Sequence, residues 1–421
     1  MRTTALEHEH HAVPAFRPMP RLRLIAAAIG VIVTLMWSGA PAYTRAQGSR
    51  QLPDRLSDAD FWALSEALSE PPGQFHSDNL VSNEIEFQKI LPGLSDRHPS
   101  GGVYLGVGPE QNFTYIAALE PRVAFILDIR AENRGLHLLY KALFELAHSR
   151  AEFVSLLFSR PMRPSSPATA APAAAELFAA LDPAAPTEAQ LSENLTRVLG
   201  VLRDRHHFTL STRDLDGLRR AYQEFARAGV SASYSSPRMP MTYNTYADLM
   251  QVTDATGQPA SYLATDARFQ VVKDLEARNL VVPVIGDFSG PTALRAIGNW
   301  LRDRQATVTV FYLSNVEDYL AGEASASFCR NVATLPIDDD SDFIRSSRFG
   351  TVLHTPAPHP SQASLPPLPH RATGFVTFTD IVPKPPPPDL HFVGGIAWRP
   401  STATALLTRT SRITEELSAC R

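Results

Sequence analysis

The chain has 421 residues, of which 44% are hydrophobic and 19% are charged, a composition typical of a globular protein with at least one sizeable core. The formal net charge is −4, and acidic and basic residues are interspersed along the chain. This distribution excludes the basic stripe that nucleic-acid-binding proteins normally carry, so we expect no nucleic-acid partner.

The N-terminal 45 residues have the order of features found in a secretory signal. Arginines precede an uncharged, largely apolar run that begins at Leu24, and small residues follow it as far as Ala42. A buried core helix is the alternative. We predict a signal peptide or membrane anchor in residues 1–45, and an exported or membrane-anchored chain held through residues 24–42. If this segment is not cleaved, it contacts the membrane. Arginines on both of its sides leave open which side the folded part occupies.

Residues 55–350 show the alternation of elements that is typical of an α/β domain. The apolar run at 123–127 has no polar face, as a strand in a parallel sheet covered by helices requires. Up to residue 150, the predicted elements are helices at 56–68 and 81–91, a strand at 103–105, a helix at 110–119, a strand at 123–127 and a helix at 136–147.

Residues 150–240 are mostly helical in pattern, after a stretch rich in Pro, Ala and Ser, and we interpret them as a helical insertion. The α/β pattern then resumes with a strand at 280–285, a helix at 291–304 and a strand at 307–313. The sequence therefore predicts an α/β fold. Its sheet is Rossmann-like, mostly parallel and flanked by helices, with the helical insertion between the second and third strands.

Residues 351–421 form a proline-rich C-terminal tail. Two proline-rich tracts surround one plausible strand at 373–382. We expect this tail to be poorly ordered or loosely docked. The two cysteines, Cys329 and Cys420, leave a single bridge open if the chain is exported, but the pattern favours incidental residues, one buried and one in the loose tail.

A glycine turn and an acidic residue carry the most specific chemistry. Gly106 and Gly108 follow a short apolar strand and precede a helix, and Asp128 ends the next strand, 20 positions after Gly108. Such a turn lets the backbone approach a ligand, and an acid at that spacing accepts ribose hydroxyls. Taken singly, both glycines fit ordinary turns and Asp128 fits a helix cap. Together they predict a small-molecule ligand at the carboxyl ends of the strands.

This stretch departs from the dinucleotide pattern G-x-G-x-x-G, because Pro109 to Asn112 supply no third glycine for close contact with a pyrophosphate. The residues V-Y-L-G-V-G-P, with Asp128 downstream, resemble the glycine motif and ribose-binding acid of class I S-adenosylmethionine-dependent methyltransferases. The blocks NLVSNE, GVYLGVGPEQNFTYIAAL and FYLSNVEDYL also resemble an uncharacterised bacterial family with this core, which brings no known activity. The resemblance implies S-adenosylmethionine as cofactor, bound by Gly106, Gly108 and Asp128.

Two later strand ends are similar to the same methyltransferase pattern. Asp287 follows the strand at 280–285, where the family often has an acid near the adenine. Asn315 follows the strand at 307–313, where the family often has an Asn or Asp beside the methyl group and its acceptor. The resemblance thus implies cofactor binding by Asp287 and a catalytic position for Asn315. As alternatives, Asp287 caps the following helix and Asn315 begins a short one.

We predict no metal site. The histidines and glutamates at 7–11 precede the apolar segment and fit a solvated flank. The aspartates at 338–342 lack the glycine and the terminal glutamate of a known calcium loop. His206 and His207 end an amphipathic helix, where positive charge suits the helix dipole.

The sequence leaves competing functions. The first is an S-adenosylmethionine-dependent methyltransferase of unknown acceptor. The alternative is an exported or membrane-tethered, non-catalytic ligand-binding domain of the same fold; a nicotinamide-linked oxidoreductase is disfavoured by the glycine pattern. The first reading conflicts with the export signal, because S-adenosylmethionine is made in the cytosol. Fold alone does not decide between these functions.

Overall fold

A computed structural model describes residues 51–164, 173–235, 243–348 and 406–419. All of them belong to the second of two units into which the chain divides, Ser49–Arg421. Within these ranges, no helix combines the length and the apolar character that crossing a membrane requires. The predicted signal or anchor at 24–42 and the predicted strand at 373–382 lie outside the described residues.

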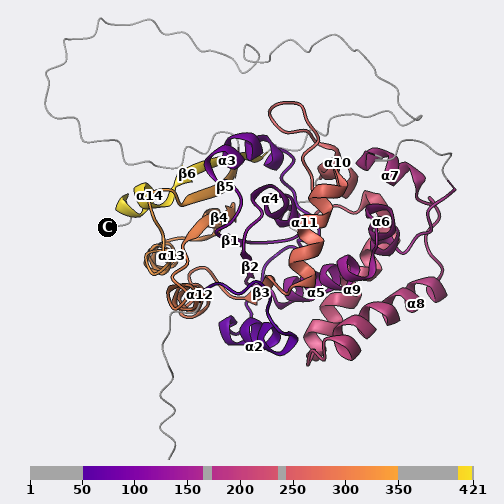
Figure 1. The fold of residues 1–421 in the computed structure, drawn as a ribbon, viewed down its shortest axis with the longest axis horizontal. Helices are drawn as coiled ribbons and strands as arrows, with labels where there is room; N and C mark the ends of the chain where they lie inside the picture. Colours follow the sequence, from indigo (N-terminus) through magenta and orange to yellow (C-terminus); the bar gives the residue numbers. More distant parts are fainter. Residues whose placement is uncertain (1–50, 165–172, 236–242, 349–405, 420–421) are drawn as a thin grey trace, which may run out of the picture. The chain divides into compact units, whose positions relative to one another are not determined.

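A six-stranded sheet forms the centre of this unit (Figure 1), with the strand order β3-β2-β1-β4-β5-β6. The first five strands in this order are parallel, and β6 runs antiparallel to β5. The prediction of an α/β fold with a mostly parallel sheet flanked by helices is confirmed. The strands are β1 (Val103–Gly106), β2 (Val123–Asp128), β3 (Val281–Ile285), β4 (Val308–Ser314), β5 (Asp342–Arg348) and β6 (Leu406–Arg412).

Helices cover both faces of the sheet. Figure 1 shows α2, α12 and α13 on one side and α4, α5 and α11 on the other. The described helices are α2 (Asp58–Leu68), α3 (Leu91–Arg97), α4 (Gln111–Leu119), α5 (Ala131–Leu146), α6 (Arg150–Phe158), α7 (Ala174–Ala180), α8 (Glu188–Leu199), α9 (Thr212–Ala228), α10 (Tyr246–Gln251), α11 (Asp266–Ala277), α12 (Ala293–Arg302), α13 (Glu323–Val332) and α14 (Ile413–Ala419). Short helical turns are η1 (Phe87–Ile90), η2 (Gly200–Arg205), η3 (Gly229–Ser231) and η4 (Val316–Tyr319).

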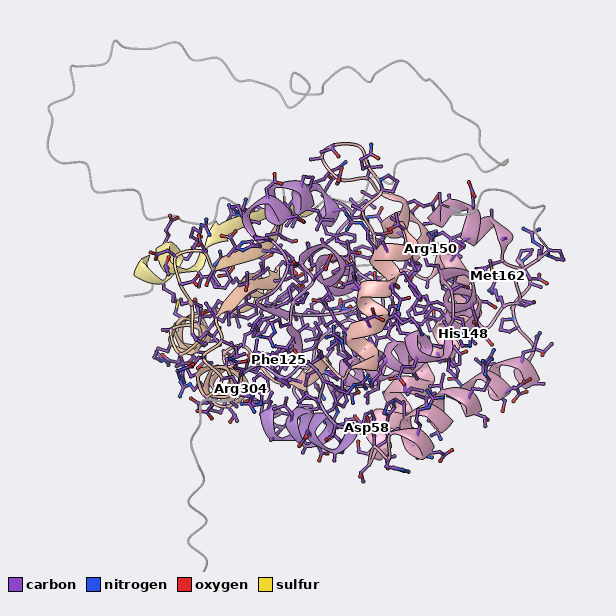
Figure 2. The ribbon with its side chains drawn as sticks, viewed as in Figure 1. Asp58, Phe125, His148, Arg150, Met162 and Arg304 are labelled. Atoms are coloured by element: carbon purple, nitrogen blue, oxygen red, sulfur yellow. The ribbon has the colours of Figure 1, made fainter. Side chains whose placement is uncertain are left out.

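Helices cover both faces of β1, β2 and β3, which explains why the sequences of these strands are apolar. Every residue of β1, β2 and β3 is buried. On the α12 side of β2, the Phe125 ring meets Trp300 edge to face at 5.4 Å between centroids, and the Arg304 guanidinium lies over the Trp300 ring (Figure 2). Such contacts between the sheet and its helices explain why no polar residue interrupts these strands.

Helices α5 and α9 pack closely enough to exclude side chains between their backbones. A Cβ atom on Gly135 would lie 2.9 Å from the Asp214 carbonyl oxygen. Beside this contact, Arg134 donates from Nε and Nη2 to the two carboxylate oxygens of Asp214, at 2.8 and 2.9 Å. Both side chains are buried, so this pair fixes the helical region beside the sheet.

The predicted helix at 81–91 is wrong in its first half. The described helical turns begin only at Phe87, with η1 and then α3. The Ser82 backbone N–H donates to Glu110 Oε1, and the side chain of Glu84 reaches the carboxyl ends of β4 and β5. These tertiary hydrogen bonds hold residues 82–84 in a conformation that a helix does not allow.

The expectation of a poorly ordered or loosely docked tail is wrong for residues 406–419. Strand β6 pairs with β5 over seven positions, from Asp342↔Arg412 to Arg348↔Leu406. Ile413 is completely buried, and its N–H donates to the Ser341 carbonyl oxygen at 2.9 Å. Strand β5 itself is polar in sequence, and its Arg345 is held by Glu317 and Glu416, so the hydrophobic pattern does not reveal it.

The interpretation of Cys329 as an incidental residue is also wrong. Cys329 lies on α13, is half-buried and is disulfide-bonded. The other cysteine of the sequence, Cys420, lies outside the described residues. The sequence leaves a single bridge open as the alternative, and Cys329 follows that alternative.

Candidate ligand-binding site

A cavity of about 730 Å³ opens at the carboxyl ends of the parallel strands. Residues that follow β1, β2, β3 and β4 line it, together with part of the segment between α2 and η1. Its volume lies within the range of small-molecule sites, roughly 300–1,000 Å³. Four of the five predicted site residues line this cavity: Gly108, Asp128, Asp287 and Asn315.

The fifth, Gly106, supports the glycine turn from behind. A Cβ atom on Gly106 would lie 2.0 Å from Asn112 Oδ1, so no other residue fits here without moving Asn112. Asn112 Nδ2 donates to the carbonyl oxygens of Val107, Gly108 and Pro109 at 2.8 to 3.2 Å. One buried amide therefore fixes the turn, and Gly106 provides the space for it.

Gly108 brings the backbone to the cavity in a left-handed conformation, with a φ of 80°. Glycine adopts this region without steric cost. The imidazole of His137 on α5 lies below the turn, with Nε2 2.9 Å from the Gly108 carbonyl oxygen. Burial lowers the pKa of His137 to about 4, although this hydrogen bond raises it. The ring is therefore neutral at physiological pH, with the Nε2 proton donated to Gly108.

Asp128 ends β2 and is held by the arginine two residues after it. Arg130 donates to Asp128 from its backbone N and from Nε, both to Oδ1, and from Nη2 to Oδ2, at 2.8 to 3.0 Å. Both side chains are almost fully buried. A carboxylate offers about four acceptor positions, so one remains on Oδ2. In this arrangement Asp128 has one acceptor position left for a further donor, whereas the sequence predicts an acid that accepts two ribose hydroxyls.

Asp287 lines the cavity and also organises the loop after β3. Its Oδ1 accepts hydrogen bonds from the backbone N and the Oγ of Ser289, both at 2.8 Å. The first N–H groups of α12 are satisfied instead by Glu70, whose Oε2 accepts from Thr292 and Ala293. Asp287 therefore holds the loop after β3, but it does not cap α12 as the alternative predicts; Glu70 does so.

Asn315 lies directly before η4, as its alternative reading predicts. Its Nδ2 is 3.4 Å from Asp318 Oδ2, and its backbone carbonyl oxygen accepts from the Asp318 N–H. The preceding Ser314 is left-handed, with a φ of 52°, which turns the chain sharply at the end of β4. This turn brings both Ser314 and Asn315 to the cavity.

Glu84 is a site residue that sequence reasoning missed. It is 1% exposed, yet it lines the cavity. Tyr312 donates to its Oε1 at 2.8 Å, Ser314 donates to the same oxygen, and Ser346 donates to Oε2. Burial raises the pKa of Glu84 despite these three hydrogen bonds, which lower it. In the sequence, Glu84 is one polar residue inside a predicted helix, and nothing there indicates that it lines a site. Only the tertiary fold brings Glu84 to β4 and β5.

Gln111, the first residue of α4, extends this network. Its Nε2 donates to Tyr312 Oη at 2.9 Å, which links it to Glu84. Its Oε1 is buried and has no hydrogen-bond partner among the described residues. Buried polar atoms are nearly always paired in native structures. This unpaired acceptor on the cavity wall therefore leaves one position open to a hydrogen-bond donor.

Several aromatic side chains line the cavity. Phe75 lies against His76 and Tyr319, with ring centroids 4.2 and 5.0 Å apart, and His76 and Tyr319 are 5.6 Å apart. Tyr234 also lines the cavity. Tyr319 is 46% exposed and is the one exposed large hydrophobic side chain in the described part of the chain. We call Phe75, His76, Tyr234 and Tyr319 the aromatic rim.

The described ranges contain no group of His, Cys, Asp and Glu side chains arranged to hold a metal ion. In the acidic stretch at 338–342, Asp338 Oδ1 accepts from the backbone of Asp340, and Asp342 pairs with Arg97 and His98. Asp338 therefore stabilises its own loop, and Asp342 ties the start of β5 to the end of α3. The histidines near residue 10 lie outside the described residues.

A search of the curated proteins gives no significant match to this chain. One family model does match. Its description is "Domain of unknown function (DUF7790)", and it covers residues 79–170 and 194–369. The matched ranges contain every residue named above that lines the cavity, except Phe75 and His76. Because they cover more than half of its length, the chain belongs to the family with this domain of unknown function, DUF7790.

Proposed function

We propose that this chain is an S-adenosylmethionine-dependent methyltransferase that binds its cofactor in the strand-end cavity. One observation carries the proposal: Gly108, Asp128, Asp287 and Asn315 come from the ends of four neighbouring parallel strands and line one cavity. The strand order reverses between β1 and β4, and open α/β sheets bind ligands at such a switch point. A Rossmann-like sheet with a helical insertion at 150–240 between β2 and β3 is part of this proposal.

The charges of the cavity fit a cationic ligand. Arg130 compensates Asp128, whereas Glu84 and Asp287 form no ion pair within the described residues. S-adenosylmethionine carries a sulfonium, an ammonium and a carboxylate group, so its net charge is positive and an acidic cavity attracts it. A nicotinamide dinucleotide carries two phosphates, and the carboxylates of Glu84 and Asp287 would repel them.

The residues present fit this cofactor in specific roles. The turn at Gly108 presents backbone to the ligand, and Asp128 Oδ2 has one acceptor position for a ribose hydroxyl. Asp287 would lie near the adenine, and Asn315 beside the acceptor. When bound, the cofactor supplies an activated methyl group. The contribution of the protein is then mainly to hold the two reactants in line and to exclude water.

A second candidate function is an exported, non-catalytic ligand-binding domain, and the disulfide bond of Cys329 favours it. Disulfides are rare in the cytosol, where S-adenosylmethionine is made. Alkaline phosphatase fused after residue 60 distinguishes the two locations. Phosphatase activity would exclude a cytosolic methyltransferase, and an inactive fusion in a chain with reduced thiols would remove the export alternative.

Titration calorimetry of the full-length protein with S-adenosylmethionine tests the first proposal. We expect binding, and we expect Asp128→Asn to weaken it by about tenfold, because a charge-assisted hydrogen bond to ribose is lost. Asp214→Asn is the matched control. It changes an equally buried carboxylate that also holds an arginine through two hydrogen bonds, but it does not line the cavity. Absence of binding at ~1 mM ligand would end the proposal.

A further inference from the structure

The connected side chains of Glu84, Gln111, Tyr312 and Ser314, which we call the floor, offer acceptors and few donors. The Tyr312 hydroxyl donates to Glu84, and Gln111 Nε2 donates to Tyr312. The hydroxyl of Ser314 also donates to Glu84. The capacity that remains is on the oxygens: Gln111 Oε1 has no partner among the described residues, and Glu84 accepts three of about four possible hydrogen bonds. A ligand group that meets this floor must therefore donate hydrogen bonds.

Arg130 does not change this balance. Of the residues that the structure describes, it is the only arginine or lysine that lines the cavity. Its Nε and Nη2 donate to Asp128, and its Nη1 donates to the Asp78 carbonyl oxygen. The positive charge is thus compensated inside the protein. A ligand with a net negative charge would meet no uncompensated arginine or lysine among the described residues that line the cavity, and it would face Glu84 and Asp287 instead.

The aromatic rim adds a second, independent preference. Phe75, Tyr234 and Tyr319 line an acidic cavity with aromatic rings. The face of an aromatic ring attracts organic cations, and groups of such rings recognise ammonium ligands in proteins. The rim and the floor, which come from different segments of the chain, select the same chemistry.

We propose that the second substrate of this cavity is an organic amine that binds as its ammonium ion, with its N–H groups on Glu84 and Gln111 Oε1 and its cationic end drawn in across the aromatic rim. This inference rests on the proposed function and names its acceptor class. Methyl transfer to this substrate would be transfer to nitrogen: the ammonium ion would first give one proton to the Glu84 carboxylate, and the freed nitrogen lone pair would then take the methyl group as its bond to sulfur breaks, which leaves a neutral thioether.

Three probes of similar size and different charge test the inference: benzylamine, benzyl alcohol and benzoate. Each is titrated calorimetrically into the full-length protein at neutral pH. We expect benzylamine to bind about tenfold more tightly than benzyl alcohol, and benzoate to bind most weakly, because hydrogen bonds to a charged group are about twice as strong as neutral ones. Equal binding of the alcohol, or preferred binding of benzoate, would overturn the inference.

Two variants, together with one control, test whether the amine binds in this cavity. Glu84→Gln should lower the affinity for benzylamine about tenfold and leave that for benzyl alcohol nearly unchanged, because it removes a charge and keeps the shape. Glu276→Gln is the matched control, since Glu276 is equally buried on α11 and does not line the cavity. Tyr319→Ala changes an exposed ring and should weaken benzylamine binding without affecting the fold. Equal losses in the two glutamine variants would refute the role of Glu84.

The same samples separate this inference from the proposed function. If S-adenosylmethionine binds but the probes show no preference for the amine, the acceptor class is wrong and the cofactor proposal stands. If benzylamine binds through Glu84 but S-adenosylmethionine does not bind, the cavity is an amine site and the methyltransferase proposal fails.

Discussion

His206 Nε2 lies 2.8 Å from Glu145 Oε2, and this pair joins the end of η2 to helix α5. The other ring nitrogen, Nδ1, lies 2.7 Å from Asp58 Oδ1 at the start of α2. Lys141 approaches Glu145 at 3.0 Å from one helical turn away. One histidine therefore joins η2, α5 and α2 beside the sheet. His206 has a structural role at a helix end, as the sequence predicts.

This arrangement predicts acid sensitivity. Burial raises the pKa of Glu145, but hydrogen bonds and charges from His206 and Lys141 outweigh it and lower the pKa to about 2, from an ordinary 4.5. A depressed folded-state pKa stabilises the fold above pH 4.5, and this stabilisation is lost as the pH falls towards 2. The free energy of unfolding should thus fall by on the order of 3 kcal/mol over that window from Glu145 alone.

Urea unfolding of Glu145→Gln at neutral pH and in acid measures this contribution. The free energy of unfolding of the variant should be about 3 kcal/mol lower than that of the wild type at neutral pH, and it should fall less steeply as the pH is lowered. Glu323→Gln, which removes a carboxylate from an exposed pair with Arg330, should leave both values nearly unchanged. An identical acid decline in the wild type and in Glu145→Gln would contradict the assignment.

Glu110 predicts the opposite dependence on pH. Burial raises its pKa to about 8, although backbone hydrogen bonds lower it. Its Oε2 has no partner in the described residues, so ionisation leaves a charge without compensation. A raised folded-state pKa gives stability that is complete below pH 4.5 and is lost as the pH rises through about 8.

Glu110→Gln should therefore be more stable than the wild type above pH 8, because an amide does not ionise. Urea unfolding at about pH 6 and pH 9 checks this expectation. Burial also raises the pKa of Glu276 to about 8. The free energy of unfolding of Glu110→Gln should therefore still fall in part between the two pH values, and that of the double variant with Glu276→Gln should fall less. A variant that weakens as steeply as the wild type would show that Glu110 does not titrate in this range.

The space at Gly106 predicts a sharp effect of one added methyl group. In Gly106→Ala the Cβ atom displaces Asn112, which holds three carbonyl groups of the turn. We expect a loss of about 1–3 kcal/mol in the free energy of unfolding, together with weaker ligand binding. Gly200→Ala is the control, since its nearest atom lies 3.6 Å away and its backbone is helical, so it should gain about 0.5–1 kcal/mol. Equal unfolding midpoints for the two variants would rule out the strain.

The disulfide bond of Cys329 predicts sensitivity to reduction. Reduction should lower the free energy of unfolding by about 2–5 kcal/mol, because the unfolded chain gains freedom. Thermal unfolding with and without a reducing agent measures the difference. The variant Cys329→Ser should match the reduced protein and should not respond to the reducing agent. A wild type whose midpoint is the same in both conditions would show that the bond contributes no stability.

The sequence alone determined the class of the fold and the position of the candidate site. Apolar runs such as 123–127 specify buried parallel strands, since only a sheet covered on both faces requires them. The carboxyl ends of parallel strands share one edge of the sheet. For this reason residues far apart in the sequence, from Gly108 to Asn315, were predicted to line one site, and they line one cavity.

Only the tertiary structure decided what these residues contact. The pairing of Asp128 with Arg130, the network around Glu84 and the unpartnered oxygen of Gln111 depend on neighbours from other elements. Strand β5 and the segment 406–419 escaped prediction for the same reason, because ion pairs and strand pairing compensate their polar residues. Local patterns record which faces are buried, whereas hydrogen-bond partners across the fold are set by packing, which no single segment encodes.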